Sequence, residues 1–207
     1  MADLLERALD RAQAARVAPG AALAAEAAEI VRAARAMSER FWRGGRLLAF
    51  GSAADAAHVA VEFTHPVIVG KRALPAFAVD AVLLRTLGRP GDIAVGIGPD
   101  PGDGLLAAAR ELGMLTVALT AEAPAGSATD GRAAGAPGGS PSNERAPADP
   151  ASGGPAAEAP AGARPGERCP AEHVLVARTA DPLVAREIHV TVYHLLWELV
   201  HVFLESS

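Results

Sequence analysis

The sequence predicts an α/β fold in which helices cover both faces of a five-stranded parallel sheet, a three-layer α/β/α sandwich. Three observations support this prediction. Short apolar runs alternate with stretches of helical spacing, half of the residues are hydrophobic while only 4% are aromatic, and the length is 207 residues. A core of alanine, valine and leucine suits closely packed helices on a parallel sheet. The length provides for a single domain over residues 1–207.

The first 43 residues are predicted to form an N-terminal helical hairpin. From Leu4 to Trp42 the sequence is rich in Ala, Leu, Glu and Arg, which have good helix propensity. Pro19 and Gly20 divide this stretch, and both residue types interrupt helices. We therefore expect two helices joined at this point.

The rest of the chain alternates between predicted strands and helices. Apolar runs at residues 46–50, 73–79, 92–97, 115–120 and 173–177 are predicted as strands. Helices are predicted at residues 53–64, 104–112 and 183–204, whereas residues 79–89 are expected to form only a short connection. This alternation favours parallel strands joined by right-handed crossovers.

A change of composition separates the fourth and fifth predicted strands. Residues 121–170 are dominated by Ala, Pro, Gly and Ser and have no apolar periodicity, so they are predicted to be a disordered insertion in a loop. The only cysteine, Cys169, lies in this segment. An intramolecular disulfide or a cysteine-based metal site is therefore excluded, which suits a reducing compartment.

Charge and hydropathy exclude several classes of partner. The net charge is -5, without a dense Lys/Arg cluster, so neither nucleic acid nor an anionic membrane surface is expected as a partner. The beginning of the sequence lacks the basic and apolar regions of a secretory signal. The apolar last helix is interrupted by charged and histidine side chains, which favours a buried helix over a membrane span. We expect a cytoplasmic protein.

Four strings resemble those of the SIS (sugar isomerase) family, in particular its phosphoheptose isomerase branch. They are GGRLLAFG at 44–51, DAAHVAVEFT at 55–64, RPGDIAVGI at 89–97 and EIHVTVYH at 187–194. The resemblance implies a flavodoxin-like parallel sheet with a sugar phosphate bound at the carboxyl ends of the strands. In this family hydroxyl groups and backbone amides at helix N-termini hold the phosphate, as for other anions.

The resemblance also locates two altered ligand loops. The first reads Gly51-Ser52-Ala53-Ala54, with Ser52 as its only hydroxyl, and the second carries Asp100 and Asp103 where the family has serine and threonine. Like charges at contact distance repel by about 1 kcal/mol in water and by several in a less polar cleft. We therefore expect degenerate phosphate-binding loops in which Gly51, Ser52, Asp100 and Asp103 face the ligand, unless a bound divalent metal reverses the repulsion.

His58 and Glu62 are the first candidates for chemistry, because four residues of helix place them on one face. This spacing suits two metal ligands or an acid/base pair, although it is also common on solvated helices. The resemblance matches His58, Glu62 and His194 to residues that bind zinc or transfer a proton through an enediol. The family's glutamine at a fourth position is Arg186 here, which cannot bind a metal and is expected to pair with Glu62. The expected cofactor is none, or zinc on the three other residues.

Two functions remain open from the sequence. The first is a protein that binds a carbohydrate derivative, with reduced or lost catalysis, which explains the altered loops. The alternative is an active aldose–ketose isomerase of the sedoheptulose 7-phosphate type, in which Glu62 abstracts the proton, His194 is the acid, and Ser52 and Arg186 help to hold the substrate. In either case the apolar terminal helices predict a symmetric homodimer or homotetramer.

Overall fold

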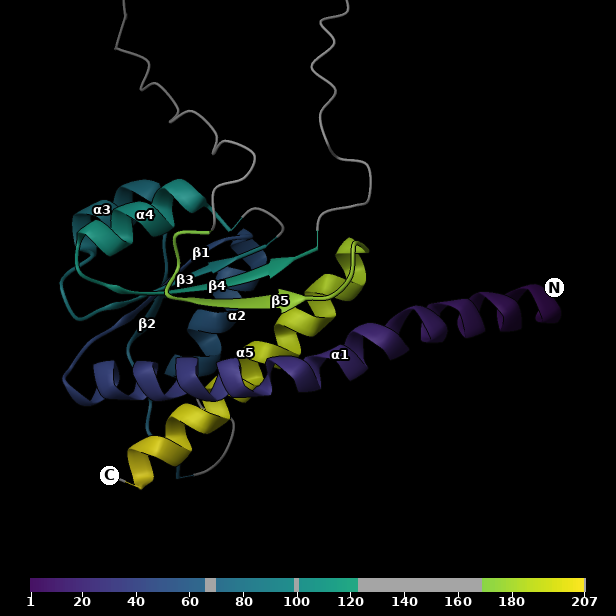
Figure 1. The fold of residues 1–207 in the computed structure, drawn as a ribbon, viewed down its shortest axis with the longest axis horizontal. Coiled ribbons are helices and arrows are strands. Elements are labelled where there is room, and N and C mark those ends of the chain that lie inside the picture. Colours follow the sequence, from purple (N-terminus) through teal and green to yellow (C-terminus); the bar gives the residue numbers. More distant parts are fainter. Residues whose placement is uncertain (66–69, 99–100, 123–168, 207) are drawn as a thin grey trace, which may run out of the picture.

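The computed structural model describes residues 1–65, 70–98, 101–122 and 169–206. Within these residues five strands form one parallel sheet in the order β2-β1-β3-β4-β5 (Figure 1). The strands are β1 (Leu47–Gly51), β2 (Ala76–Ala78), β3 (Ile93–Ile97), β4 (Leu115–Ala121) and β5 (His173–Ala177). The helices are α1 (Ala2–Trp42), α2 (Ala53–Thr64), α3 (Ala81–Leu87), α4 (Asp103–Glu111) and α5 (Pro182–Glu205). The predicted five-stranded parallel sheet is confirmed.

The sheet lies between two layers of helices. Helices α1, α2 and α5 cover one face, and α3 and α4 cover the other (Figure 1). Successive side chains of a strand point to opposite faces, so Leu47 joins the core under α1, α2 and α5 while Leu48 joins the core under α3 and α4. The larger core also contains Phe41, Phe63 and Tyr193, which are almost fully buried. The three-layer sandwich predicted from the sequence is therefore the observed fold.

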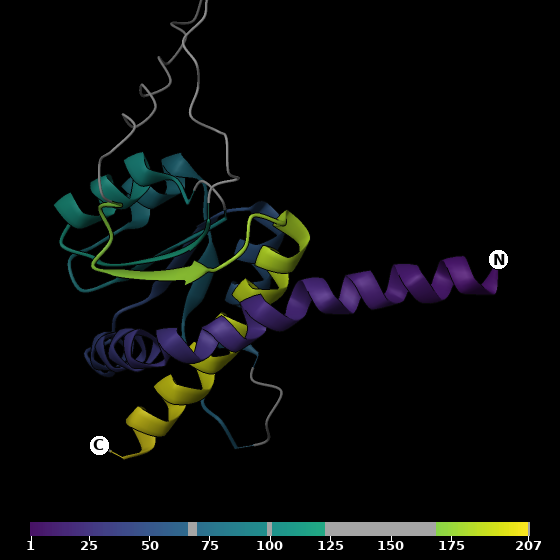
Figure 2. The same cartoon turned by 45° about the vertical axis from the view of Figure 1, so that its right-hand side comes forward.

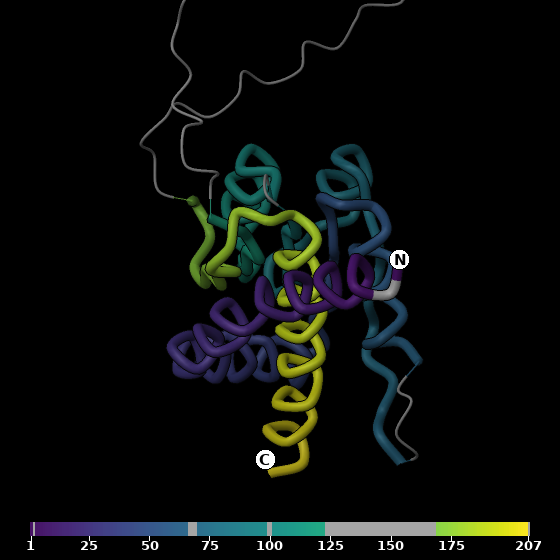
Figure 3. Tube along the Cα trace, turned by 90° about the vertical axis from the view of Figure 1, so that its right-hand side faces the viewer, coloured from purple at the N-terminus to yellow at the C-terminus, as the bar shows by residue number. Residues whose placement is uncertain are grey.

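The predicted N-terminal hairpin at residues 1–43 is wrong. Residues Ala2–Trp42 form a single helix of 41 residues that continues through Pro19, and Figures 2 and 3 show it changing direction along its length. An interior proline costs about 3 kcal/mol or more. Here Pro19 is buried, and one turn earlier Arg16 binds both carboxylate oxygens of Glu187 on α5, at 2.7 and 2.6 Å. Contacts with α5 and the good propensity of the flanking residues thus outweigh the helix-breaking signal.

The short connection expected between residues 79 and 89 is also wrong, because it contains α3. Asp80 caps this helix by accepting a hydrogen bond from the backbone of Leu83 at 2.8 Å, and Gly88 follows its end. Leu84 is fully buried against the second face of the sheet. The two cap residues were a usable signal in the sequence, but the helix is short and its apolar stripe rests on few residues.

Most of the predicted insertion at residues 121–170 lies outside the described residues, which leave out 123–168. Its first residue, Ala121, belongs to β4 and pairs with Ala177 of β5. Among the helices of the described residues, none combines the length and the apolar character that crossing a membrane requires. Helix α2 starts directly after β1 and α5 soon after β5, so both helices begin at the carboxyl edge of the sheet.

Candidate functional site between α2 and α5

Helix α2 is fixed to the sheet by a tight junction with β1. Gly51 has φ 102°, and a Cβ atom there would lie 2.2 Å from the carbonyl oxygen of Ile97, so this position requires glycine. The next backbone amide, of Ser52, donates to the same carbonyl at 2.9 Å. The chain therefore passes from strand to helix through Ser52 alone. Asp55, His58 and Glu62 follow at spacings of three and four residues and share one face of α2.

Helix α5 presents the matching face. Asp181 caps its start by accepting from the backbone amides of Leu183 and Val184, and Pro182 occupies the first turn. Proline is well suited to this position because the amide it lacks would have no partner in the helix. Arg186 lies in the second turn, and Tyr193 and His194 follow two turns later on nearly the same face.

Glu62 forms the centre of a cluster with two histidines. Its Oε1 atom lies 3.2 Å from Nε2 of His58 and 3.5 Å from Nε2 of His194. The Glu62 side chain is only 16% exposed, whereas each histidine is 43% exposed. The structure thus brings together the three residues that the resemblance pointed to, with a sheltered carboxylate between two imidazoles that solvent and ligands can reach.

Tyr193 extends this cluster inward, and nothing in the sequence pattern singled it out. Its hydroxyl lies 2.6 Å from Nδ1 of His58, on the side of the ring opposite to Glu62. Burial, reinforced by the negative charges of Asp55 and Glu62, raises the pKa of Tyr193 to about 12. The phenol therefore keeps its proton at neutral pH. Its only sequence signal was its position directly before His194.

Arg186 does not pair with Glu62 as expected from the sequence. Its Nε atom donates to Oδ1 of Asp55 at 2.8 Å. Both helices start at the same edge of the sheet, so Arg186 near the start of α5 meets Asp55 near the start of α2 instead of Glu62 two turns further on. The Asp55 side chain is 6% exposed and that of Arg186 is 56% exposed. Asp55 is therefore a site residue that the sequence interpretation missed.

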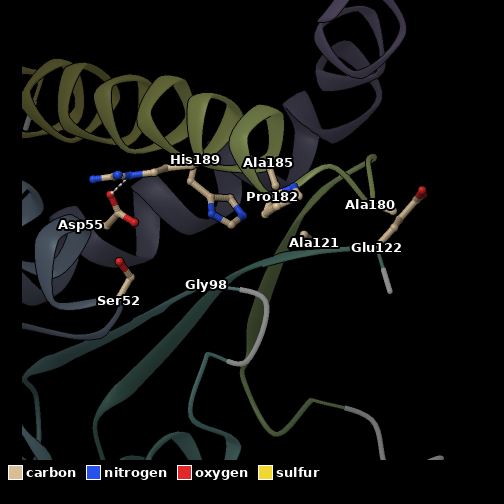
Figure 4. A pocket seen from close by; sticks show the side chains of 10 residues that line it. Ser52, Asp55, Gly98, Ala121, Glu122, Ala180, Pro182, Ala185 and His189 are labelled. Atoms are coloured by element: carbon tan, nitrogen blue, oxygen red, sulfur yellow. Dashed lines mark hydrogen bonds and ion pairs between the residues drawn. The ribbon is translucent and has the colours of Figure 1, made fainter. Parts of the chain in front are cut away.

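A pocket of about 430 Å³ opens beside this ion pair, at the carboxyl edge of the sheet (Figure 4). Ser52 and Asp55 line it from α2, Gly98 from the end of β3, and His189 from α5. The remaining lining residues are Ala121, Glu122, Ala180, Pro182, Ala185 and Arg186. His189 is buried, and its Nε2 lies 2.9 Å from the carbonyl oxygen of Thr120. Burial lowers the pKa of His189, so this side chain is neutral at pH 7.

Parts of the chain are similar in sequence to known proteins. No protein-family model matches the chain. A segment of 104 aligned residues is 39% identical to the phosphoheptose isomerase of Desulfovibrio desulfuricans, over 38% of this chain and 50% of that protein. A segment of 124 residues is 36% identical to the phosphoheptose isomerase of a Roseiflexus species, over 46% of this chain and 61% of that protein. The chain therefore spans between half and about three fifths of the length of these curated relatives.

Two solved structures share the fold over nearly the whole chain. The phosphoheptose isomerase of Neisseria gonorrhoeae matches with a TM-score of 0.65 and 20% identity, over 95% of this chain and 98% of that one. That of Francisella tularensis matches with a TM-score of 0.61 and 16% identity, over 96% and 97%. The chain is therefore similar to phosphoheptose isomerases, in sequence over these segments and in fold over nearly its whole length.

The other residues that were predicted to face the ligand do not all lie at the pocket. Ser52 lines the pocket, and Gly51 directly precedes it in the junction described above. Asp103 is the first residue of α4 and is not among the pocket residues of the described part of the chain. It lies instead beside Cys169, whose thiol pKa is raised chiefly by burial. Asp100 falls outside the described residues.

The cluster around Glu62 also has the composition of a metal site. One donor atom each from His58, Glu62 and His194 lie within 4.8 Å of one another. Imidazole nitrogen and carboxylate oxygen are ligands that zinc accepts, at about 2.0–2.2 Å from the ion. A tetrahedral ion at such distances separates its ligand atoms by roughly 3.3 Å, which fits the 3.2 and 3.5 Å between Glu62 and the two histidines.

Proposed function

We propose that this protein is an aldose–ketose isomerase that acts on a sugar phosphate, with a heptose phosphate as the first candidate substrate. The observation that supports this proposal most is the contact of the Glu62 carboxylate with both His58 and His194. Curated relatives that share 36–39% identity with segments of the chain are phosphoheptose isomerases, which favours the same reaction.

The reaction needs one base and one acid on neighbouring atoms of the sugar. Glu62 removes the proton from the carbon beside the carbonyl group while His194 donates a proton to the carbonyl oxygen, which gives an enediol. Glu62 then returns its proton to the former carbonyl carbon, and His194 takes the proton of the other hydroxyl group. Both residues end in their starting states. In the described part of the chain, the polar partners of Glu62 contact its Oε1 atom. The other carboxylate oxygen, Oε2, therefore remains for the proton transfer.

The pocket beside Asp55 and Arg186 is the proposed binding site for the sugar phosphate. Ser52 offers a hydroxyl group, and the first turn of α2 presents backbone amides and the positive end of the helix dipole. In the described part of the chain, Arg186 has a single polar partner, Asp55, which it contacts through Nε. Its two terminal nitrogens can therefore bind a phosphate group.

As an alternative to acid catalysis by His194, we propose that His58, Glu62 and His194 hold a divalent metal such as zinc, because the two separations between Glu62 and the histidines match those around a tetrahedral ion. A metal bound there would polarise the substrate carbonyl as a Lewis acid. Arginine cannot be the fourth ligand. Metal analysis of the purified protein tests this: stoichiometric zinc that disappears in His58→Ala supports the proposal, and protein that turns over without any bound metal contradicts it.

An isomerase assay with heptose, hexose and pentose phosphates tests the function. We expect turnover with at least one of them, and a loss of about 100- to 10,000-fold in Glu62→Gln, which removes the base but keeps the side-chain shape. Glu111→Gln, an exposed substitution on α4, is the matched control and should keep full activity. Thermal stabilisation by a sugar phosphate without any turnover would contradict an enzyme and support the binding protein without catalysis.

The working unit is proposed to be a symmetric homodimer or homotetramer. The N-terminal half of α1 projects beyond the sheet (Figure 1) and exposes Leu4, Leu5, Leu9 and Val17. Most of the stability of a helix in a protein comes from packing of its apolar face, so a second copy of the chain is the proposed cover for these side chains. Light scattering should give a dimer or tetramer that dissociates in the double variant Leu5→Glu, Leu9→Glu. A wild-type monomer would contradict this.

A further inference from the structure

A second pocket, of about 230 Å³, lies at the amino edge of the sheet, at the other end of β1 and β3 from the pocket beside Asp55. Four arginines line it, three from the end of α1 and its junction with β1 and one from the turn before β3. They are Arg40, Arg43, Arg46 and Arg89, and the other lining residues are Gly44, Gly45, Pro90, Gly91 and Asp92. Because Arg89 is far from the others in the sequence, folding brings these charges together.

One of the four arginines has a carboxylate partner. Asp92 is the single acidic residue that lines the pocket in the described part of the chain, and its two oxygens bind the Arg46 side chain at 3.3 and 2.5 Å. The guanidinium groups of Arg40, Arg43 and Arg89 form no hydrogen bond or ion pair with any residue that the structure describes. Three positive charges therefore face one pocket without compensation, in a chain whose net charge is -5.

The end of α1 does not account for this arrangement. The negative end of a helix dipole attracts cations, and Arg40 lies in the last turn of α1. However, the last carbonyl groups of this helix already accept from the backbone amides of Arg43, Gly44 and Gly45. The arginine side chains are thus not needed as caps. A dipole also gives no reason for Arg89 to line the same pocket, where like charges repel.

The backbone of the pocket is fixed by direct contacts between its segments. Asp92 accepts from the backbone amides of Arg46 at 2.9 Å and of Arg89 at 3.2 Å, so it joins the two segments that carry these arginines. A Cβ atom on Gly45 would lie 2.4 Å from the carbonyl oxygen of Gly91, which shows how closely the two chains pass. The frame is therefore formed in advance, while the partly exposed guanidinium groups remain able to close around a ligand.

We propose that this pocket binds a compact phosphate anion, with the diphosphate group as the ligand class. A guanidinium group matches two phosphate oxygens at once, and three of them without a partner suffice for more than one phosphate. The volume is below the roughly 300–1,000 Å³ of pockets that enclose a drug-sized molecule, so the diphosphate fills it and any larger part of a ligand lies outside. The site is separate from the pocket proposed for the sugar phosphate and does not rest on the proposed function.

Titration calorimetry of the full chain with pyrophosphate tests the site. Salt at about 0.15 M screens attraction between the ligand and distant surface charges. Arg186→Gln is the background, because the pocket at Arg186 is also proposed to bind phosphate. We expect one pyrophosphate per chain in this background, and an affinity about 10-fold lower or less when Arg43→Gln or Arg89→Gln is added, since each removes charge-assisted hydrogen bonds. No binding in the Arg186→Gln background would overturn the proposal.

Arg11→Gln is the matched control. It removes the same charge from an exposed position of α1 outside the pocket, so the affinity should stay nearly unchanged. A loss as large as in Arg43→Gln would show attraction to overall charge alone and would overturn the site. Arg43 and Arg89 are exposed, and their variants should keep the melting temperature of the parent. An inactive isomerase would refute the proposed function and leave this titration unaffected.

A parallel titration with ADP identifies the source of the diphosphate. Equal affinities for ADP and pyrophosphate indicate that the diphosphate alone is recognised, and tighter binding of ADP indicates a nucleotide whose nucleoside lies outside the pocket. Both results support the site if Arg89→Gln weakens them. Binding of ADP that is insensitive to Arg43→Gln and Arg89→Gln, with no binding of pyrophosphate, would place the ligand elsewhere and refute the proposal.

Discussion

Two arginine–aspartate pairs lie at opposite ends of the sheet and differ in how completely their hydrogen-bonding capacity is used. Arg46 and Asp92 stand at the amino ends of β1 and β3, and Arg186 and Asp55 join α5 to α2 near the carboxyl ends of the strands. Both aspartates are almost buried, with side chains 5% and 6% exposed. The arginines differ, because Arg46 is 24% exposed and Arg186 is 56% exposed.

The carboxylate of the Arg46–Asp92 pair, called the saturated pair below, accepts four hydrogen bonds. The carboxylate of the Arg186–Asp55 pair, called the open pair, accepts one. Asp92 accepts hydrogen bonds from the backbone amides of Arg46 and Arg89 and from Nε and Nη2 of Arg46, and that Nη2 also donates to the carbonyl of Leu87. Asp55 accepts one bond from Arg186. Both pairs line a pocket, of about 230 Å³ at Arg46 and Asp92 and of about 430 Å³ at Arg186 and Asp55. In the described part of the chain, Arg46 uses Nη2 for hydrogen bonds within the protein, whereas Arg186 keeps both terminal nitrogens available for a ligand. The comparison distinguishes an ion pair with many partners in the protein from the pair that is proposed to bind the substrate.

The largest effect is expected at the saturated pair. Asp92→Asn replaces an acceptor of four hydrogen bonds by a group that offers one oxygen and two donors, and it leaves the charge of Arg46 without its partner. We expect the free energy of unfolding to fall by about 2–4 kcal/mol. Urea denaturation measures this, with the exposed Asp10→Asn as control. Folded Asp92→Asn should keep the KM of the wild type. A raised KM would show that the Arg46–Asp92 pair also contributes to substrate binding.

The open pair should respond in the opposite way. Arg186→Gln is expected to raise KM for a phosphorylated substrate about 10-fold or more, since a charge-assisted hydrogen bond is worth roughly 1.5–3 kcal/mol. Asp55→Asn should leave KM unchanged or lower it, because Arg186 keeps its charge and loses the competing carboxylate. Steady-state kinetics on both variants tests this asymmetry. Equal increases of KM in the two variants would mean that this pair, like Arg46 and Asp92, is only structural.

The parts of the molecule that follow a regular period were predictable from the sequence. The strand runs were found within a few residues, and the spacing of His58 and Glu62 placed both on one face of α2 because a helix fixes that geometry. Their meeting with His194 required the family resemblance, since no local pattern relates α2 to α5. The continuous α1 was missed because Pro19 is a local signal, whereas the contacts that outweigh it, such as Arg16 with Glu187, come from far along the chain.

The partners within the site were not predictable for a related reason. Which turn of α2 faces Arg186 depends on how the two helices start at the sheet edge, and a shift of two turns decides between Asp55 and Glu62. Tyr193 was missed because an aromatic residue in an apolar helix indicates core packing. Its ring does belong to the core, and only the 2.6 Å contact of its hydroxyl with His58 connects it to the site.

The smallest effect is expected at His189, a buried and uncharged side chain that lines the pocket. Burial lowers its pKa below the ordinary value of 6.5, so the unfolded chain binds a proton more readily than the folded protein. Stability is therefore fully present above pH 6.5 and is lost as the pH falls toward the folded-state pKa. His189→Gln should weaken this acid-side dependence in urea denaturation across that range. An identical pH dependence of stability in the wild type and in His189→Gln would show that His189 is not the titrating group.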